Sequence, residues 1–577
     1  MALITEPLPA SNELLRCQAE ADVRSACADE SSYGDFQGKR YCVLHFPSKK
    51  KGAAFGAALK RKMDAKDFNF SGVWFPDEVQ FLHTTFKAKV DFFKATFNAP
   101  ANFSSATFKG PVSFRECTFI ADAHFDHANF HALAIFSQAS FGAKADFQHA
   151  SFSRYAQTYF AEATFNGEAD FREATFDSLA DFGRVTFKVT KFDKASFNDQ
   201  SVFTEACFGD EASFFRASFT KEAAFRNAGF KSYANFSFTT FEEAEFRDAS
   251  FSVGGEANFR QALFGTRASF SYTRFGAEVL FTSATFKTQA YFSKVTFGGR
   301  ADFSYALFDN FAKFAGDKHA SPSDGLPSLD FQHARIEKPD HFSFVGLSLR
   351  PHWFMHVDLR KLDFTDVRWE GGISQEIEEL EKKEVSSPGL LLAIIYRQLA
   401  VNAEDNHRYE EASKFRYRAM ELQRDARWRD FVFWDGLKGR ISKRLQRFSG
   451  RRLFAPFTRD WLYWLYWAAS GYGERILRGF FVLIGIWLLF AWLYMRVDFN
   501  HPGQGPATVS MAADKAEAGE PLRFKRALIY SLGVMSLQRP DPRPLTNSAY
   551  TLVALQTILG PLQAALLALA FRRKFMR

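Results

Sequence analysis

The sequence predicts a mostly β protein: a long solenoid of short strands, then a helical hairpin and two membrane-spanning helices. Three observations predict this order. A phenylalanine returns every five or six residues from Phe81 to Phe314. From Leu390 to Arg427 apolar residues recur at three and four, which is typical of helices. Near the C-terminus, Gly479 to Met495 and Ala549 to Phe571 are apolar runs long enough to cross a bilayer.

The repeating unit reads Ala-Asx-Phe-x-x-Ala-Thr/Ser-Phe, as in Ala101 to Phe108 and Ala169 to Phe176. Neither a helix of 3.6 residues per turn nor a simple strand of period two matches gaps that alternate between five and six. A solenoid does, if each short unit forms one side of a coil and the Phe and Ala side chains face the axis. The predicted inward rings include Phe103, Phe108, Phe171, Phe176, Phe303 and Phe308.

An inward ring should not tolerate a charge, because burying a carboxylate without a partner costs several kcal/mol. We therefore expect Phe171→Asp to unfold neighbouring coils, and Arg172→Asp, at an outward position, to be tolerated. The spacing lengthens from Phe152 to Phe160 and from Phe251 to Phe259, and it shortens from Phe187 to Phe192. We interpret these irregularities as loops and tight corners.

These units resemble the pentapeptide-repeat family, whose A-[DN]-[LF]-x-x units wind into a right-handed, four-sided β-helix. The extra residue in alternate units departs from that pattern and should bulge one side in two. With four units per coil, the resemblance implies roughly ten coils and a rod about 50 Å long. Some soluble members of the family imitate DNA with an acidic rod and bind topoisomerase. The nearly balanced charge of this rod argues against that role, and no nucleic-acid partner is expected.

The N-terminal arm carries a candidate metal site. Cys42 and His45 place two soft ligands one turn apart, and the upstream Cys17 and Cys27 would complete a tetrahedral Cys₃His set. Four protein ligands leave no open position, so the sequence predicts a structural zinc rather than a catalytic one. The alternative is a set of reduced thiols on a mobile arm.

Charge sets the predicted membrane topology. Basic residues crowd before the first apolar run, at Arg475 and Arg478, and after the second, at Arg572 to Arg577, so both termini should be cytoplasmic. A separate basic stretch, Lys438 to Arg459, lies further upstream. The Trp and Tyr cluster at Trp461 to Trp467 suits an interfacial helix at the lipid surface. Met1 to Leu15 lacks the features of a signal peptide, in agreement with a cytoplasmic start. The predicted domains are the arm 1–63, the solenoid 64–370, a helical adaptor 371–448 and a membrane module 449–577 with span 479–495, loop 496–548 and span 549–571.

The loop between the spans holds a further apolar segment. Phe524 to Leu537 is too apolar for a free loop and too short to span, and in this place it resembles the pore helix of two-helix cation channels. The T-x-G-Y-G filter of that family is missing, and without its glycines the carbonyl ring of a potassium filter has no obvious way to form. The residues that stand in its place are Ser536, Leu537, Gln538 and Arg539.

The resemblance implies a closed homo-oligomeric ring, most plausibly of four chains. A half-depth segment needs protein neighbours for its backbone, and Gln538 and Arg539 would be costly against lipid. Gln556, Gly560 and Gln563 would offer small or polar groups for helix contacts on the second span.

No catalytic motif is present, so an enzyme is not expected. Two functions remain open. The first is a membrane-anchored protein whose channel-like module conducts ions or has a regulatory role. The second is a non-conducting scaffold, tethered to lipid, whose rod binds an unidentified protein partner.

Overall fold

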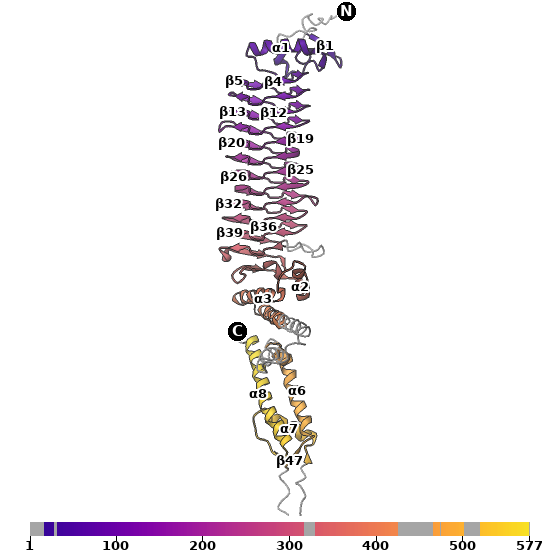
Figure 1. Ribbon diagram of the computed structural model, residues 1–577, viewed down its shortest axis with the longest axis vertical. Coiled ribbons are helices and arrows are strands. Elements are labelled where there is room, and N and C mark those ends of the chain that lie inside the picture. Colours follow the sequence, from indigo (N-terminus) through magenta and orange to yellow (C-terminus); the bar gives the residue numbers. More distant parts are fainter. Residues whose placement is uncertain are drawn as a thin grey trace, which may run out of the picture. The chain divides into compact units, whose positions relative to one another are not determined.

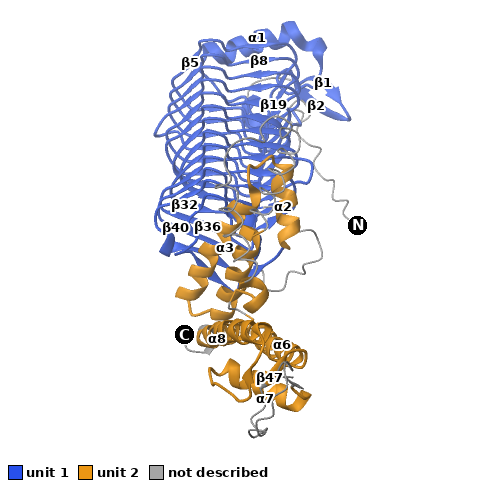
Figure 2. Ribbon diagram, turned by 60° about the horizontal axis from the view of Figure 1, so that its bottom comes forward, with its two compact units in different colours: residues 1–371 blue, residues 372–577 orange. Residues whose placement is uncertain are grey.

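The computed structural model describes residues 17–27, 32–316, 329–424, 466–472, 475–500 and 520–575. The chain divides into two compact units, residues 1–371 and 372–577 (Figure 2). The first contains a β-solenoid of about 13 turns, and the second contains the C-terminal helices (Figure 1). Several predicted features lie wholly or mainly outside the described residues: the start of the arm (Met1 to Leu15), the basic stretch (Lys438 to Arg459) and the aromatic cluster (Trp461 to Trp467).

Each coil of the solenoid has four sides, and each side carries a short strand. In one coil these strands are β5 (Thr85–Phe86), β6 (Val90–Asp91), β7 (Thr96–Phe97) and β8 (Ala101–Asn102). Each pairs in parallel with the strand one coil further on, so that Thr85 lies opposite Thr107. This pairing confirms the four-sided β-helix, which extends from β3 (Trp74–Phe75) to β46 (Arg368–Trp369). The predicted ten coils are too few, because the looser units at both ends also complete turns.

The alternation of five and six residues comes from two kinds of corner. The tight corner is a β-turn that starts at a Phe: the Ala106 amide donates to the Phe103 carbonyl over 3.0 Å, and Ser105 has φ 54°. The Asx residue before the Phe holds this turn, since Asn102 Oδ1 accepts from the Ser104 amide at 2.9 Å. That bond is the physical reason for the Asx in the units that carry one. The extra residue lies in the other, wider corner.

Irregular spacing is absorbed locally. Where Phe187 and Phe192 are only five residues apart, a single strand, β22 (Thr186–Lys191), runs through the position of the wide corner. The neighbouring β19 (Thr164–Asp170) keeps its extra residue and bulges against β22. The six-residue gaps at β19 and β25 (Cys207–Ser213) are also spanned by single strands, so the missing residue is not the cause of the continuous strand, and the tight corner stays a prediction. The two longer gaps do form loops, with Tyr155 and Val253 exposed.

Phenylalanine rings fill the axis of the solenoid in four ladders. Phe103 stacks on Phe125 with centroids 4.9 Å apart, and Phe171 stacks on Phe192 at 4.7 Å. Rings of adjacent ladders meet edge to face, as Phe103 and Phe114 do at 5.3 Å. All six rings predicted to face inward are at most 1% exposed. Burial of each ring contributes about 1.5–3 kcal/mol, before the entropy of ordering is subtracted.

One outward position is not inert. The Arg172 guanidinium binds the fully buried carboxylate of Asp170, with Nη2 2.6 Å from Oδ2 and Nε 2.9 Å from Oδ1. Burial opposes ionisation of Asp170, yet the guanidinium holds its pKa below the ordinary value. Arg172→Asp would set a second carboxylate beside Asp170, so the expectation that it is tolerated does not hold.

The second unit contains helices and one small sheet. Its adaptor part consists of α2 (Ile373–Lys382), α3 (Pro388–Asp405) and helical residues 409–424. Its apolar part consists of α6 (Ile476–Tyr494), α7 (Phe524–Met535) and α8 (Asn547–Phe575), with a sheet of β47 (Asp498–Asn500), β48 (Glu520–Pro521) and β49 (Arg543–Pro544). By length and composition, α6 and α8 are able to cross a membrane, and they coincide with the two predicted apolar runs.

Candidate metal centre and re-entrant helix

The segment before the first coil is folded. It contains a short 3₁₀ helix (Arg24–Cys27), the antiparallel strands β1 (Ser32–Phe36) and β2 (Lys39–Cys42), and the helix α1 (Gly52–Asp64). The helix α1 was not predicted, although its sequence is rich in the helix formers Ala, Lys and Arg and the buried Phe55 and Ala58 are three residues apart. The Phe55 ring packs edge-on against Phe75 of the first coil at 5.5 Å. The described part of the arm therefore lies against the solenoid.

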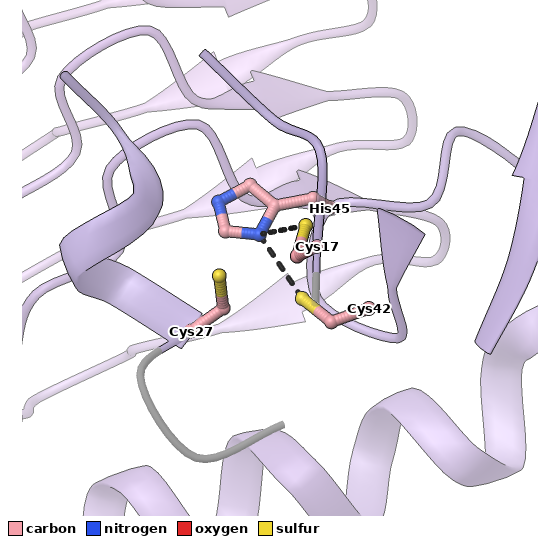
Figure 3. A group of neighbouring side chains, drawn as sticks. All are labelled: Cys17, Cys27, Cys42 and His45. Carbon is pink, nitrogen blue, oxygen red and sulfur yellow. Dashed lines mark hydrogen bonds between the residues drawn. The ribbon is translucent and has the colours of Figure 1, made fainter. Parts of the chain in front are cut away.

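The four predicted ligands come together in this segment. The Sγ atoms of Cys17, Cys27 and Cys42 and a ring nitrogen of His45 lie within 4.8 Å of one another, and all four residues are buried. Figure 3 shows the sulfurs and the imidazole facing one common space, with His45 Nδ1 3.1 Å from Cys42 Sγ and 3.8 Å from Cys17 Sγ. One ligand atom from each residue makes a set that could hold a metal ion.

A second contact orients the imidazole. His45 Nε2 lies 3.0 Å from the Ser71 carbonyl, so this nitrogen carries the proton and donates when Nδ1 is a ligand. The following Gly72 has φ 66°, and a Cβ there would come within 2.8 Å of Val23 and 3.1 Å of His45. Ser71 and Gly72 carried no signal of this role in the sequence, because a backbone carbonyl acts and the contact is long-range.

The thiols perturb one another strongly. Hydrogen bonds from Cys27 and Cys42 lower the pKa of Cys17 far below its ordinary value, and contacts with Cys17 and Cys42 raise the pKa of Cys27. Burial acts to lower the pKa of His45, but the neighbouring thiols raise it to about 9. The cluster therefore stabilises a thiolate next to shared protons, which a bound cation would displace.

The apolar segment between α6 and α8 forms a short helix, α7 (Phe524–Met535), which packs against both of them. β47 and β49 place the start of α8 beside the end of α6, and β48 leads into α7 at the same end. From there α7 reaches only Met535, which abuts Gly560 near the middle of α8. Twelve residues of helix span about 18 Å, roughly half a bilayer core. α7 thus lies alongside α6 and α8 at the end that carries the small sheet (Figure 1).

Hydrogen bonds of polar side chains join α6, α7 and α8. Gln556 of α8 is fully buried; its Oε1 accepts from the Tyr494 hydroxyl at 2.7 Å, and its Nε2 donates to Ser531 Oγ at 2.6 Å and to the Ser531 carbonyl at 3.1 Å. Ser531 Oγ in turn donates to the Trp487 carbonyl of α6 at 2.9 Å. Every polar atom of the Gln556 side chain has a partner. The sequence analysis identified Gln556 but not Tyr494, Ser531 or Trp487.

The polar and small residues of α8 serve contacts within the chain. Gln563 Nε2 donates to the carbonyls of Ala469 at 2.7 Å and Gly479 at 2.9 Å. A Cβ at Gly560 would lie 2.5 Å from Met535 Cγ. These residues therefore give no support to contacts between chains, contrary to the interpretation drawn from the sequence.

The tip of the re-entrant segment is a closed turn. Leu537 has φ 60°, and the Gln538 amide donates to the Gly533 carbonyl at 2.9 Å, which caps α7. No extended row of carbonyls follows within this turn. The four residues predicted as pore-loop-like are all exposed in the single chain: Ser536, Leu537, Gln538 and Arg539.

Comparison with known proteins identifies the repeat. The family model described as pentapeptide repeats (9 copies) matches residues 92–140 and 147–196, both within the solenoid. Neither a curated protein nor a solved structure matches the chain.

Proposed function

We propose that this pentapeptide-repeat protein is anchored in a membrane by α6 and α8, with both termini in the cytoplasm. The excess of basic residues before the first helix and after the second supports this topology. In this arrangement the sheet of β47, β48 and β49 lies on the outer side, and the solenoid is cytoplasmic.

The re-entrant α7 is the observation that carries a channel-like function. A half-depth helix between two spans leaves polar groups near the bilayer centre: the tip residues Ser536, Gln538 and Arg539 are exposed in the single chain. Lipid is a costly environment for them, whereas a water-filled pathway lined by neighbouring copies is not. We therefore propose a closed ring of chains, most simply four as in the two-helix channels. Because side chains and not carbonyls line the tip, the charge of Arg539 favours anions.

Full-length protein in mild detergent is expected to have the mass of a ring, and in liposomes it is expected to pass chloride more readily than potassium. A chain stopped before Trp461 should be monomeric, because it lacks the spans. Arg539→Gln should keep the ring and reduce the preference for chloride, since only the charge is lost.

Two outcomes would contradict this proposal. A monomeric full-length protein, or a truncated chain that is equally oligomeric, would show that the spans are not the assembly device. A ring without flux of either ion would favour the second function, a non-conducting scaffold whose solenoid binds a protein partner.

We further propose that the Cys₃His cluster binds a structural zinc ion. Three thiolates and one imidazole suit the tetrahedral preference and borderline softness of Zn²⁺ better than those of Mg²⁺ or Ca²⁺. The complete burial of Cys42, at 0% exposed, supports a structural role, since a catalytic ion needs an open position.

Purified protein is expected to hold about one zinc per chain, a full Cys₃His site. Cys27→Ser should lower the zinc content strongly, because an alcohol is a poor zinc ligand, whereas Cys207→Ser, on the solenoid strand β25 (Cys207–Ser213), should not. Metal analysis after purification without chelator is the measurement. A content below about a tenth of an equivalent would exclude the site.

A further inference from the structure

Each coil of the solenoid uses the coil before it as a hydrogen-bond acceptor. On the side that contains β3, the Thr96 amide donates to the Val73 carbonyl at 2.9 Å, and the Thr118 amide donates to the Ala95 carbonyl at 2.9 Å. The first coil has no coil before it. Its amides on this side would form an open edge, which is the usual template for pairing with another chain.

The knuckle between the ligands Cys42 and His45 occupies the place of the missing coil. The Trp74 amide, which corresponds to Thr96 one coil later, donates to the Leu44 carbonyl at 3.0 Å. Leu44 is itself 1% exposed, and its carbonyl also accepts from Lys51 Nζ at 2.8 Å. The backbone between two metal ligands thus supplies the last rung of the sheet.

The next edge donor is removed by sequence. Asn98 donates its amide to the Phe75 carbonyl at 3.1 Å, and the residue that corresponds to Asn98 in the first coil is Pro76, which has no N–H. On this side of the coil, two successive donors are therefore dealt with in different ways. The Trp74 amide needs the Leu44 carbonyl of the knuckle as its acceptor, whereas Pro76 has no amide hydrogen to satisfy.

The metal ligands also hold the other parts of this cover. His45 Nε2 contacts the Ser71 carbonyl of the first coil, and Cys27 ties the segment 17–27 to the knuckle across the cluster. Apart from the cluster, that segment is bound by contacts such as the one from Lys62 Nζ to the Ala26 carbonyl, 3.0 Å, and by exposed ion pairs of Lys94. Surface ion pairs contribute little, with a median below about 1 kcal/mol.

We propose that the metal ion holds the N-terminal cap of the solenoid in place, and that its loss opens the edge at Ser71 to Trp74 to pairing with a second copy of this chain. This inference rests on the proposed zinc site. It assigns the ion a task beyond local folding: the ion keeps a strand edge covered. A second copy is the fitting partner because its first coil presents the same edge, where the Ser71 carbonyl of one chain can accept from the Trp74 amide of the other.

Hydrogen exchange on full-length protein in detergent tests this inference, with the metal content measured on the same samples. On removal of zinc by a chelator under reducing conditions, the Trp74 amide, followed in peptides covering residues 70–76, should exchange at least about tenfold faster, because local opening no longer has to break the metal cluster. Peptides from mid-solenoid, such as residues 160–182, should not change. The metal-free protein should also form larger particles, with masses that are multiples of the mass of the metal-loaded particle. Adding zinc back should reverse both the faster exchange and this association.

Variants distinguish an ion that holds the cap in place from an ion that is bound without this role. Cys27→Ser should reproduce the fast exchange without chelator, and Cys207→Ser should exchange as the unaltered protein does. If zinc is bound but the amides exchange equally fast in loaded and stripped protein, the proposed role of the ion is contradicted and the zinc site is not. A protein that never takes up zinc would instead overturn the site itself.

Discussion

Phe171→Asp is expected to abolish the protease resistance of the middle of the solenoid. The Phe171 ring is 0% exposed and stacks between Phe147 at 4.8 Å and Phe192 at 4.7 Å. Removing a buried ring costs roughly 3–5 kcal/mol, and an unpartnered carboxylate in its place adds to that cost. Since each coil contacts only its neighbours, the disruption should spread to the adjacent coils before it reaches the ends.

Limited proteolysis with mass mapping of the first cuts is the measurement. Lys188→Asp is the matched control, because Lys188 is exposed on β22, one coil away, and its replacement introduces the same acid on the surface. Equal resistance of both variants would mean that Phe171 does not support the coils around it. Arg172 cannot serve as the control, since it balances the buried Asp170.

Gln556→Leu is expected to release α7 from the two long helices. Leu has nearly the same volume as Gln, and a membrane helix tolerates it. The substitution removes three hydrogen bonds that link α8 to Tyr494 and Ser531. At about 0.6 kcal/mol for each such bond in a membrane protein, the module should lose roughly 2 kcal/mol. The tip of the segment should then lose its fixed depth.

Thr557→Val is the matched control, because Thr557 is the next residue and its exposed hydroxyl donates only to the Val553 carbonyl of its own helix. Hydrogen exchange of peptides within residues 524–540 and the melting temperature in detergent should change for Gln556→Leu and stay within error for Thr557→Val. If the two variants behave alike, the polar cluster does not position the re-entrant helix.

Sequence periodicity predicted the solenoid because its code is local and repeated. Phe at the axis, Ala beside it and, in many units, Asx before it each follow from one corner of one coil, and the Phe recurs in every coil of the repeat. The Cys₃His set was also visible, since ligand chemistry is written in residue types. Leu44 and Ser71 could not be identified in this way, because their carbonyls act and a carbonyl is common to all residues. Gln556 shows the same limit, because its partners Tyr494 and Ser531 lie on other helices. Arg172 differs, since its partner Asp170 is only two residues away and the burial of that carboxylate decides its role.

The bulge of β19 against β22 has a consequence for how this protein can change in length. One residue can be lost at a wide corner while the ring ladder continues, because the neighbouring strand takes up the difference and Phe165 still stacks on Phe187 at 5.0 Å. Register is therefore restored within a single coil, and errors do not accumulate along the axis. Duplication or deletion of a whole coil would then lengthen or shorten the solenoid by about 4.8 Å, and both of its ends would keep their structure.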